Sequence, residues 1–409
     1  MIPTAINLYV FAVLPDQEIV QVGRILSTNL GSPGQYEGYF KYDPAYLTHP
    51  KRYAIDPVHL PLEAITFKTP NRETGLHDIF SDSLPDAWGI HLLARKGGLE
   101  RQRYAPPHLL KALQGQGIGR FIFSESEQPP QLIDASIDFE DIETAINEAG
   151  LLESSLATET AELRHLLACG TSAGGARPKV LTRKDDIHWL AKFSSKHDPH
   201  PSIFVALEEA GLTLAAQAGL NVPEFQRVAV KQRDLLLIKR FDITATAGRN
   251  AICSFKTLTG NNDPYTTCYA DLAAIIRHHS YQPKHDLEQL FRQMIVNVLL
   301  INTDDHLQNF AMLHTEAGWR LSPSYDIVPN LYQPGQILQI NQKHTGITKE
   351  DIILEGRKFG FSKQRARRIL SDTRAQLKNW QTVFNNCRVP ASHSRELQDN
   401  IAGRLTAIE

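Results

Sequence analysis

Acidic and amide side chains are concentrated in the nine residues NTDDHLQNF, from Asn302 to Phe310. Asp304 and Asn309 are five positions apart, as are the aspartate and asparagine of the protein-kinase catalytic loop H-R-D-x-x-x-x-N. In that loop the aspartate accepts the proton of the acceptor hydroxyl, and the asparagine helps to hold Mg²⁺. A polar helix end with solvated side chains explains the same residues, because short motifs often match by chance.

A second acid strengthens the kinase interpretation. Asp326, in RLSPSYDIVPN, lies 22 residues beyond Asp304 and is expected to follow a short strand. Kinases place a metal-binding aspartate at such a position, and Mg²⁺ prefers oxygen ligands. Asn309 and Asp326 together therefore predict a Mg²⁺ site, although Asp326 alone could be a turn residue ahead of Pro329.

A glycine-rich stretch, GTSAGGARPK, spans Gly170 to Lys179. Small residues expose backbone N–H groups that can surround phosphate oxygens, and Arg177 and Lys179 add positive charge. The stretch matches neither a Walker A loop nor G-x-G-x-x-G, so a flexible surface loop remains an alternative.

A lysine within an apolar strand supplies the next candidate. Lys192 lies in HWLAKF, and a kinase uses such a strand lysine on the α- and β-phosphates, paired with a glutamate of the next helix. The following helix offers Glu208 and Glu209, whereas an edge-strand lysine is the simpler alternative. The order of these parts along the chain is the order found in protein-kinase-like folds.

The surrounding pattern predicts the elements that position these residues. Residues 5–14 and 18–26 are rich in β-branched and aromatic residues and flank Pro15-Asp16, which predicts a hairpin. Residues 179–193 predict two strands joined by a turn at Lys184–Asp186. The alanine-rich stretch that follows predicts a helix with Gly219 at its carboxyl end.

The helix before NTDDHLQNF has the clearest pattern. Apolar residues recur there at helical spacing, and further apolar residues beside them make the apolar face of the helix wider. This pattern predicts burial on several sides. They are Leu287, Leu290, Phe291, Met294, Ile295, Val296, Val298, Leu299, Leu300 and Ile301. The polar cluster therefore begins where a buried helix ends, which is a rigid mount for functional groups.

Composition restricts the class of protein. The 409 residues suggest two or three domains, and the net charge of −2, from 43 basic and 45 acidic residues, argues against a broad nucleic-acid surface. DNA would be reached mainly through a basic partner. The four cysteines are far apart and without C-x-x-C spacing, as expected of a reducing cytosol. No apolar run approaches the ~20 residues of a membrane span, so we expect a cytoplasmic protein without membrane contact.

Four motifs together resemble the HipA family of serine/threonine kinases, which are toxins of HipBA-type toxin–antitoxin modules. The motifs are NTDDHLQNF, GTSAGGARPK, SYDIVPN and LPDAWGIHLL, and the resemblance covers most of the chain. It implies an α+β, protein-kinase-like two-lobed fold with a β-rich N-terminal subdomain and an all-helical C-terminal lobe. The implied division is a β-rich subdomain at 1–105, a helical connection at 106–165, an ATP-binding part at 166–260 and a helical lobe with the catalytic loop at 261–409.

The resemblance also implies roles for individual residues. Asp304 matches the catalytic base, Asn309 and Asp326 match the Mg²⁺ ligands, and Lys192 with Glu208 matches the ATP-phosphate lysine and its partner. Ser172 matches the autophosphorylated serine of the glycine-rich loop, whereas Asp305 receives no role and is taken as loop variation. The remaining matches to the ATP site are Ala173, Gly174, Gly175, Lys179, Lys239, Arg240 and Phe241, with His306 in support.

By this resemblance the protein is an ATP- and Mg²⁺-dependent serine/threonine protein kinase that arrests growth and is associated with persistence. Autophosphorylation at Ser172 would inactivate it, and a HipB-like helix-turn-helix antitoxin would neutralise it. A translation factor and an aminoacyl-tRNA synthetase are candidate protein substrates.

Three other functions stay open at this stage. A small-molecule kinase also pairs an Asp-Asn loop with a later aspartate, and a catalytically silent corepressor would only bind an antitoxin–DNA complex. A metal phosphohydrolase built on Asp304, Asp305 and His306 would need further histidines at ligand spacing.

Overall fold

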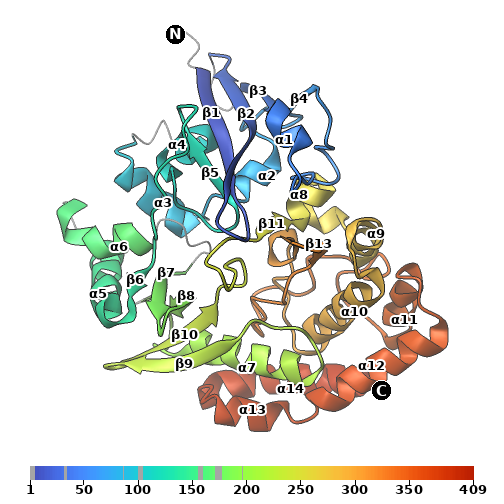
Figure 1. Cartoon of the computed structure of the whole chain (residues 1–409). Coiled ribbons are helices and arrows are strands. Elements are labelled where there is room, and N and C mark those ends of the chain that lie inside the picture. The colour runs from blue at the N-terminus through green and yellow to red at the C-terminus, as the bar shows by residue number, and fades with distance from the viewer. Residues whose placement is uncertain are drawn as a thin grey trace. The chain divides into compact units, whose positions relative to one another are not determined.

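The computed structural model describes residues 5–31, 35–85, 87–99, 105–154, 160–170, 177–195 and 197–409. The chain divides into two compact units. Figure 1 shows the whole chain, with the colour running from blue at the N-terminus to red at the C-terminus. Unit 1 comprises Met1–Lys196 and Leu237–Cys253, and unit 2 comprises His197–Leu236 and Ser254–Glu409. The four-part division expected from the sequence stays a prediction.

Unit 1 contains a five-stranded sheet in the order β4-β3-β2-β1-β5. The hairpin predicted around Pro15 is confirmed, because β1 and β2 pair antiparallel from Ala5↔Thr28 to Val13↔Ile19. The strands are β1 (Ala5–Val13), β2 (Ile19–Asn29), β3 (Tyr36–Tyr42), β4 (Thr66–Lys68) and β5 (Phe121–Ser124).

Aromatic side chains form the core beside this sheet. Phe40 contacts Tyr42 and Phe80 at ring-centroid distances of 4.9 and 5.1 Å, and Phe80 also meets Phe121 and Phe123. Four helices belong to this part of unit 1: α1 (Pro44–Thr48), α2 (Asp78–Ser81), α3 (Ala87–Lys96) and α4 (Pro106–Leu113).

The second part of unit 1 carries the strands expected at 179–193. β7 (Lys179–Lys184) and β8 (Ile187–Phe193) pair antiparallel, and Asp185 and Asp186 form the turn with φ of 52° and 59°. Positive φ at both central residues matches the twist of a two-residue hairpin, which explains an aspartate pair there. The other elements are β6 (Ile137–Asp138), η2 (Phe139–Asp141), α5 (Ile142–Glu153), η3 (Thr160–Leu163), α6 (Arg164–Cys169) and the end of β10 (Arg233–Lys239).

Unit 2 is built largely of helices. The predicted alanine-rich helix is α7, and Gly219 follows its end with φ of 84°. Its elements are α7 (Ile203–Gln217), β9 (Phe225–Val230), α8 (Phe255–Thr259), η4 (Pro264–Thr266), α9 (Tyr269–His279), α10 (Pro283–Leu299), η5 (Leu307–Asn309), β12 (Ala311–Thr315), β13 (Gly318–Leu321), α11 (Lys349–Lys358), α12 (Lys363–Leu377), α13 (Trp380–Asn386) and α14 (Ala391–Ala407). The short β11 (Ala251–Ser254) spans the division between the units.

One expectation for unit 2 needs correction. The C-terminal part is not all-helical, because β12 and β13 pair antiparallel from Met312↔Leu321 to Thr315↔Gly318. The alternating exposure of β13 and a turn ending in Gly318, whose φ is 117°, favour this hairpin over a helix.

The predicted helix before NTDDHLQNF is α10, the central helix of unit 2. It packs against α9, α12, α14 and β13, and Phe291 meets the rings of Phe359 and Phe361 at 5.4 Å each. Its apolar positions from Leu290 to Leu299 are buried, as the sequence predicts. Among the described residues, no helix is long and apolar enough to cross a membrane.

Candidate active site

The polar loop begins with a backbone conformation that is costly for its residue. Ile301 has φ of 57°, which crowds a β-branched side chain. Two hydrogen bonds hold this turn, because the Asn302 amide donates to the Asn297 carbonyl at 2.9 Å and the Asn330 amide donates to the Ile301 carbonyl at 3.0 Å. Strain maintained by its surroundings is typical of a functional site.

Asp304 and its neighbours differ sharply in exposure. The Asp304 side chain is 58% exposed, whereas Thr303 and Asp305 are fully buried. His306 Nε2 lies 4.0 Å from Asp304 Oδ1, too far for a hydrogen bond, and the Nδ1 atom of the same ring accepts from the Gln308 amide at 3.2 Å. Asp304 is therefore presented to solvent between two buried residues of the loop.

Asn309 has an oriented amide group. Its Nδ2 donates to the Asp304 carbonyl at 2.7 Å, and its backbone amide donates to the His306 carbonyl at 2.9 Å. Because the nitrogen end of the side chain is directed to the loop, the amide oxygen is the end available to a cation.

Asp326 lies in the same unit, and both Asp326 and the residue before it form hydrogen bonds with this loop. Its backbone adopts a left-handed conformation with φ of 53°, and its carbonyl accepts from Asn302 Nδ2 at 3.4 Å. The preceding Tyr325 donates its hydroxyl to the Gln308 carbonyl at 2.9 Å, next to Asn309. The structure thus gathers the predicted base and both predicted metal ligands on connected segments of unit 2.

Asp305 has a defined environment that the sequence did not reveal. Its Oδ2 accepts from the Tyr269 hydroxyl and its Oδ1 from the Ile337 amide, each at 2.6 Å. Burial raises the pKa of this carboxyl group to about 6, although these hydrogen bonds act in the opposite direction. The partners lie 36 and 32 residues away, so no local motif identifies the role, and the interpretation as loop variation is wrong.

The predicted phosphate-binding lysines lie in unit 1. Lys179 and Lys192 are directly opposite each other in the β7–β8 pair, and Lys179 is only 5% exposed. Like charges directly opposite each other are unfavourable by themselves, and a buried lysine is costly unless a negative group lies near it. Lys192 shares the more exposed face of β8 with His188 and Leu190.

Arg240 is held inside unit 1. Its guanidinium group forms two hydrogen bonds with the Asp242 carboxylate at 3.0 and 2.7 Å, and its amide donates to the His188 carbonyl at 3.0 Å. Burial opposes ionisation of Asp242, but Arg240 keeps the pKa of that carboxyl group below its ordinary value. The side chain and the amide of Arg240 therefore have structural partners, while Lys239 and Phe241 beside it are half-buried.

Glu208 and Glu209 on α7 have different surroundings. Glu208 is 5% exposed, whereas Glu209 forms an ion pair with Arg227 at 3.1 Å. Glu208 belongs to unit 2 and Lys192 to unit 1, so their pairing stays a prediction. The predicted phosphate-loop residues Ser172, Ala173, Gly174 and Gly175 lie outside the described residues.

The helix that carries Glu208 approaches the segment after Asp326 without room for a side chain. A Cβ atom on Gly211 would lie 2.0 Å from the Ile327 carbonyl oxygen. Both residues belong to unit 2, and glycine is the residue that permits this backbone contact.

The mixture of helices and strands and the arrangement of the loop define an α+β, kinase-like fold, as expected from the sequence. The model of the HipA-like C-terminal domain matches residues 171–380, and that of the HipA N-terminal domain matches residues 19–124. The C-terminal match alone spans more than half of the chain, and the protein belongs to the HipA family.

Individual relatives are more distant. The chain is 26% identical over 133 residues to "Putative kinase Y4mE" of Sinorhizobium fredii and 25% identical over 181 residues to a "Putative kinase" of Haemophilus influenzae. These matches cover 30% and 39% of this chain but only 32% and 52% of the relatives, so the chain spans about half of their length or less.

A solved structure matches nearly the whole chain. It is that of HipA from Shewanella oneidensis MR-1 in a complex with HipB and operator DNA. The match has a TM-score of 0.67 and covers 98% of this chain and 95% of that one, at 15% sequence identity. A likeness at this identity concerns the fold.

Proposed function

We propose that this protein is an ATP- and Mg²⁺-dependent serine/threonine protein kinase in which Asp304 is the catalytic base. The observation that carries the proposal is the loop of unit 2, where the exposed Asp304 carboxylate stands between fully buried neighbours. Membership of the HipA family and two relatives with kinase names support it.

The residues of unit 2 fit a magnesium ion bound with a nucleotide. Mg²⁺ is usually held by one or two side-chain oxygens together with phosphate oxygens, and Asn309 and Asp326 offer an amide oxygen and a carboxylate. When bound, ATP supplies the transferred γ-phosphoryl group, and Mg²⁺ offsets its negative charge. Asp304 accepts the proton of the acceptor hydroxyl, and the fixed loop keeps its carboxylate oriented for that step.

The residues of unit 1 fit the nucleotide phosphates. Lys179 and Lys192 concentrate positive charge at one end of the β7–β8 pair, and Lys192 is the residue we assign to the α- and β-phosphates. Glu208 is assigned as its partner because it is the more buried of the two glutamates on α7. Both assignments follow the usual electrostatics of phosphoryl transfer.

The test is transfer of labelled phosphate from ATP to protein acceptors by wild type and Asp304→Asn. We expect the variant to lose transfer by about 10²–10⁴-fold, the usual contribution of a positioned base, while Mg²⁺–ADP binding by calorimetry persists. Glu316→Gln, an exposed carboxylate on the β12–β13 turn, is the matched control and should keep full transfer. Full transfer by Asp304→Asn would refute the assignment.

Self-inactivation through Ser172 is part of the proposal. A phosphoserine adds about −1.5 to −2 charges, which would repel the phosphates of ATP from the glycine-rich stretch. Ser172→Ala should bind ATP and keep its activity during incubation with ATP, whereas wild type should lose activity as it gains phosphate. Mass spectrometry that finds the phosphate on another residue would contradict this mechanism.

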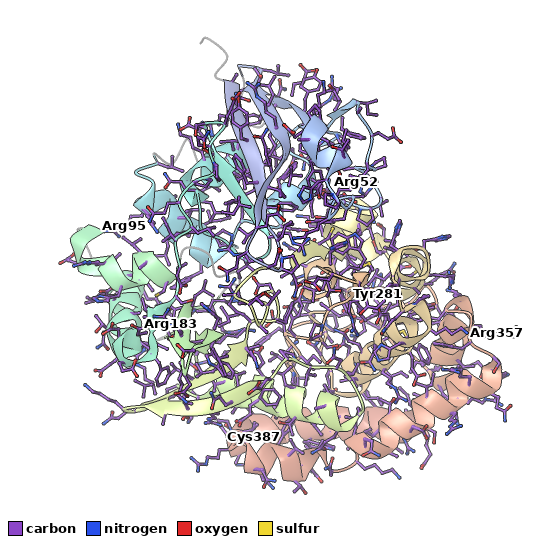
Figure 2. All side chains as sticks on the ribbon, in the orientation of Figure 1. Arg52, Arg95, Arg183, Tyr281, Arg357 and Cys387 are labelled. Carbon is purple, nitrogen blue, oxygen red and sulfur yellow. The ribbon has the colours of Figure 1, made fainter. Side chains whose placement is uncertain are left out.

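We further propose that a DNA-binding antitoxin of the HipB type neutralises this protein, and that the complex binds DNA. HipA of Shewanella oneidensis is found with HipB and operator DNA, and this chain has a locally basic surface despite its balanced charge. That surface, here called the α11–α12 basic surface, comprises the exposed residues Arg357, Lys358, Lys363, Arg365, Arg367 and Arg368. Four of them, Lys358, Lys363, Arg365 and Arg368, form ion pairs with Glu355, Glu350, Glu288 and Asp372, which reduces the positive charge of this surface. Figure 2 shows Arg357 on α11, at the margin of unit 2.

The same surface suits a catalytically silent corepressor, which is the second candidate function. The two functions differ in their dependence on Asp304. A corepressor would repress transcription through the antitoxin but would not arrest growth when expressed alone. Growth arrest by wild type and its absence in Asp304→Asn, with repression retained in both, would favour the kinase.

A further inference from the structure

The Asp305 carboxylate closes a buried chain of hydrogen bonds that joins three elements of unit 2. Asn297 Nδ2 on α10 donates to the Tyr269 hydroxyl at 3.0 Å, and that hydroxyl donates to Asp305 Oδ2 at 2.6 Å. The Ile337 amide, on the segment that returns after Asp326, donates to Oδ1 at 2.6 Å. Tyr269 and Asp305 are fully buried, so water does not compete for these bonds.

The same returning segment also holds the start of the loop. Gln336 Nε2 donates to the Asn302 carbonyl at 2.9 Å, and Asn302 Nδ2 donates to Asn297 Oδ1 at 3.0 Å. Asn297 thus takes part in both connections, one through Tyr269 and one through Asn302. The loop is therefore fixed at two points, Asn302 and Asp305, that lie on either side of Asp304.

Adjacent side chains of this loop face different environments. Asp305 points into the core and Asp304 is exposed, and the two are joined by a single planar peptide unit with few free rotations. An inward anchor at Asp305 consequently limits the positions that the Asp304 carboxylate can occupy.

We propose that Asp305 is a positioning residue, which sets the orientation of Asp304 through its bonds to Tyr269 and Ile337. This inference rests on the proposed function of Asp304 as the base. The carboxylate is suited to the task because two converging donors from distant elements require two acceptor oxygens on one side chain. An asparagine of the same shape has only one acceptor oxygen, so it cannot reproduce both bonds unchanged.

A purely structural role for Asp305 makes a different prediction. If Asp305 only contributes to folding, its replacement lowers the melting temperature and leaves the activity of the folded fraction intact. If Asp305 positions the base, the folded fraction loses more in kcat than in nucleotide binding, because the assigned phosphate-binding lysines lie in unit 1 and only the assigned Mg²⁺ ligands Asn309 and Asp326 are connected to the loop. Misplacement of a reacting group by ~1 Å can cost about 100-fold in rate.

The experiment compares wild type with the variants Asp305→Asn and Tyr269→Phe. Asp372→Asn, at an exposed position on α12, is the control. Steady-state kinetics give kcat and the KM for ATP, calorimetry gives the Kd for Mg²⁺–ADP, and hydrogen exchange reports on residues 302–309. We expect Asp305→Asn to lose about 10–100-fold in kcat, with a clearly smaller change in KM and Kd. Exchange should rise in residues 302–309 and not in α10, and Tyr269→Phe should show a smaller change of the same kind.

Two results would overturn the proposal. One is wild-type kcat together with unchanged loop exchange in Asp305→Asn. The other is a parallel loss of kcat, Mg²⁺–ADP binding and protection throughout unit 2, which indicates a folding defect. If wild type transfers no phosphate, the proposed function fails separately, and loop exchange alone then decides whether Asp305 fixes this segment.

Discussion

Replacement of Asp305 by asparagine should change how the stability of the protein depends on pH. The carboxyl group is fully buried, and burial raises its pKa from an ordinary value of 3.8 to about 6. The groups that face it include the Tyr269 hydroxyl, the Ile337 amide and the Gln336 side chain, and burial together with Asp305 itself raises the pKa of Tyr269 well above its ordinary value. The folded chain therefore holds a proton at Asp305 at pH values where the unfolded chain has released it.

The size and sign of the effect follow from this difference in pKa. About two pKa units at ~1.4 kcal/mol each correspond to roughly 3 kcal/mol of unfolding free energy. Because the folded pKa is the higher one, stability due to this group falls as the pH rises from about 4 to 6, and the full cost persists above that range. Between pH 5 and 7 the change amounts to about 1 kcal/mol. Asparagine cannot ionise, so Asp305→Asn should lack this component.

Urea unfolding at a series of pH values between about 5 and 8 measures the effect, where the full cost is reached near pH 7. The free energy of Asp305→Asn relative to wild type should become more favourable by about 1 kcal/mol as the pH rises. Asp304→Asn removes a charge from the adjacent, exposed position and is the matched control, whose profile should parallel that of wild type. Parallel profiles for Asp305→Asn and wild type would refute the argument, even if the two proteins differ in absolute stability.

Three further predictions concern packing and charge. Gly211→Ala should destabilise unit 2 by about 1–3 kcal/mol in urea unfolding, because the new Cβ atom would lie 2.0 Å from the Ile327 carbonyl oxygen. Gly403→Ala is the control and should be neutral or stabilising, because the space around Gly403 is open. Arg240→Met should cost about 3–5 kcal/mol in thermal unfolding of unit 1, since it removes the cation that is paired with the buried Asp242 carboxylate. Arg357→Glu with Arg367→Glu should weaken DNA binding by the antitoxin complex and reduce its salt dependence; unchanged salt dependence would exclude the α11–α12 basic surface.

The sequence predicts the parts of this structure whose signal is local. The β1–β2 hairpin follows from a turn at Pro15, and α10 follows from a repeat of apolar residues within one helix. The sequence predicts a short strand before Asp326, but its pairing with β12 was missed because β12 and β13 are only five and four residues long, too short for a clear period. β13 also packs against α9 and α10, and such tertiary contacts are not visible in the local sequence.

The candidate site divides in the same way. Asp304, Asn309 and Asp326 are recognisable by spacing and order, since a catalytic loop keeps its chemistry within a few residues. Asp305 is not recognisable, because its partners Tyr269 and Ile337 come from other elements. Adjacent identical residues can thus be separated by the fold into an exposed acid and a buried anchor, and only burial distinguishes them.

The left-handed backbone of Ile301 lowers the free energy of unfolding, and the same residue contributes to a rigid loop. Such a conformation costs a residue of this kind about 1–3 kcal/mol, but the Ile301 side chain is only 2% exposed, and replacement by glycine would lose its burial, which costs as much or more. Glycine would also give the end of α10 a freedom that the loop does not now have. Selection for thermostability and selection for phosphoryl transfer are therefore both expected to retain Ile301, because its burial offsets the strain of its backbone.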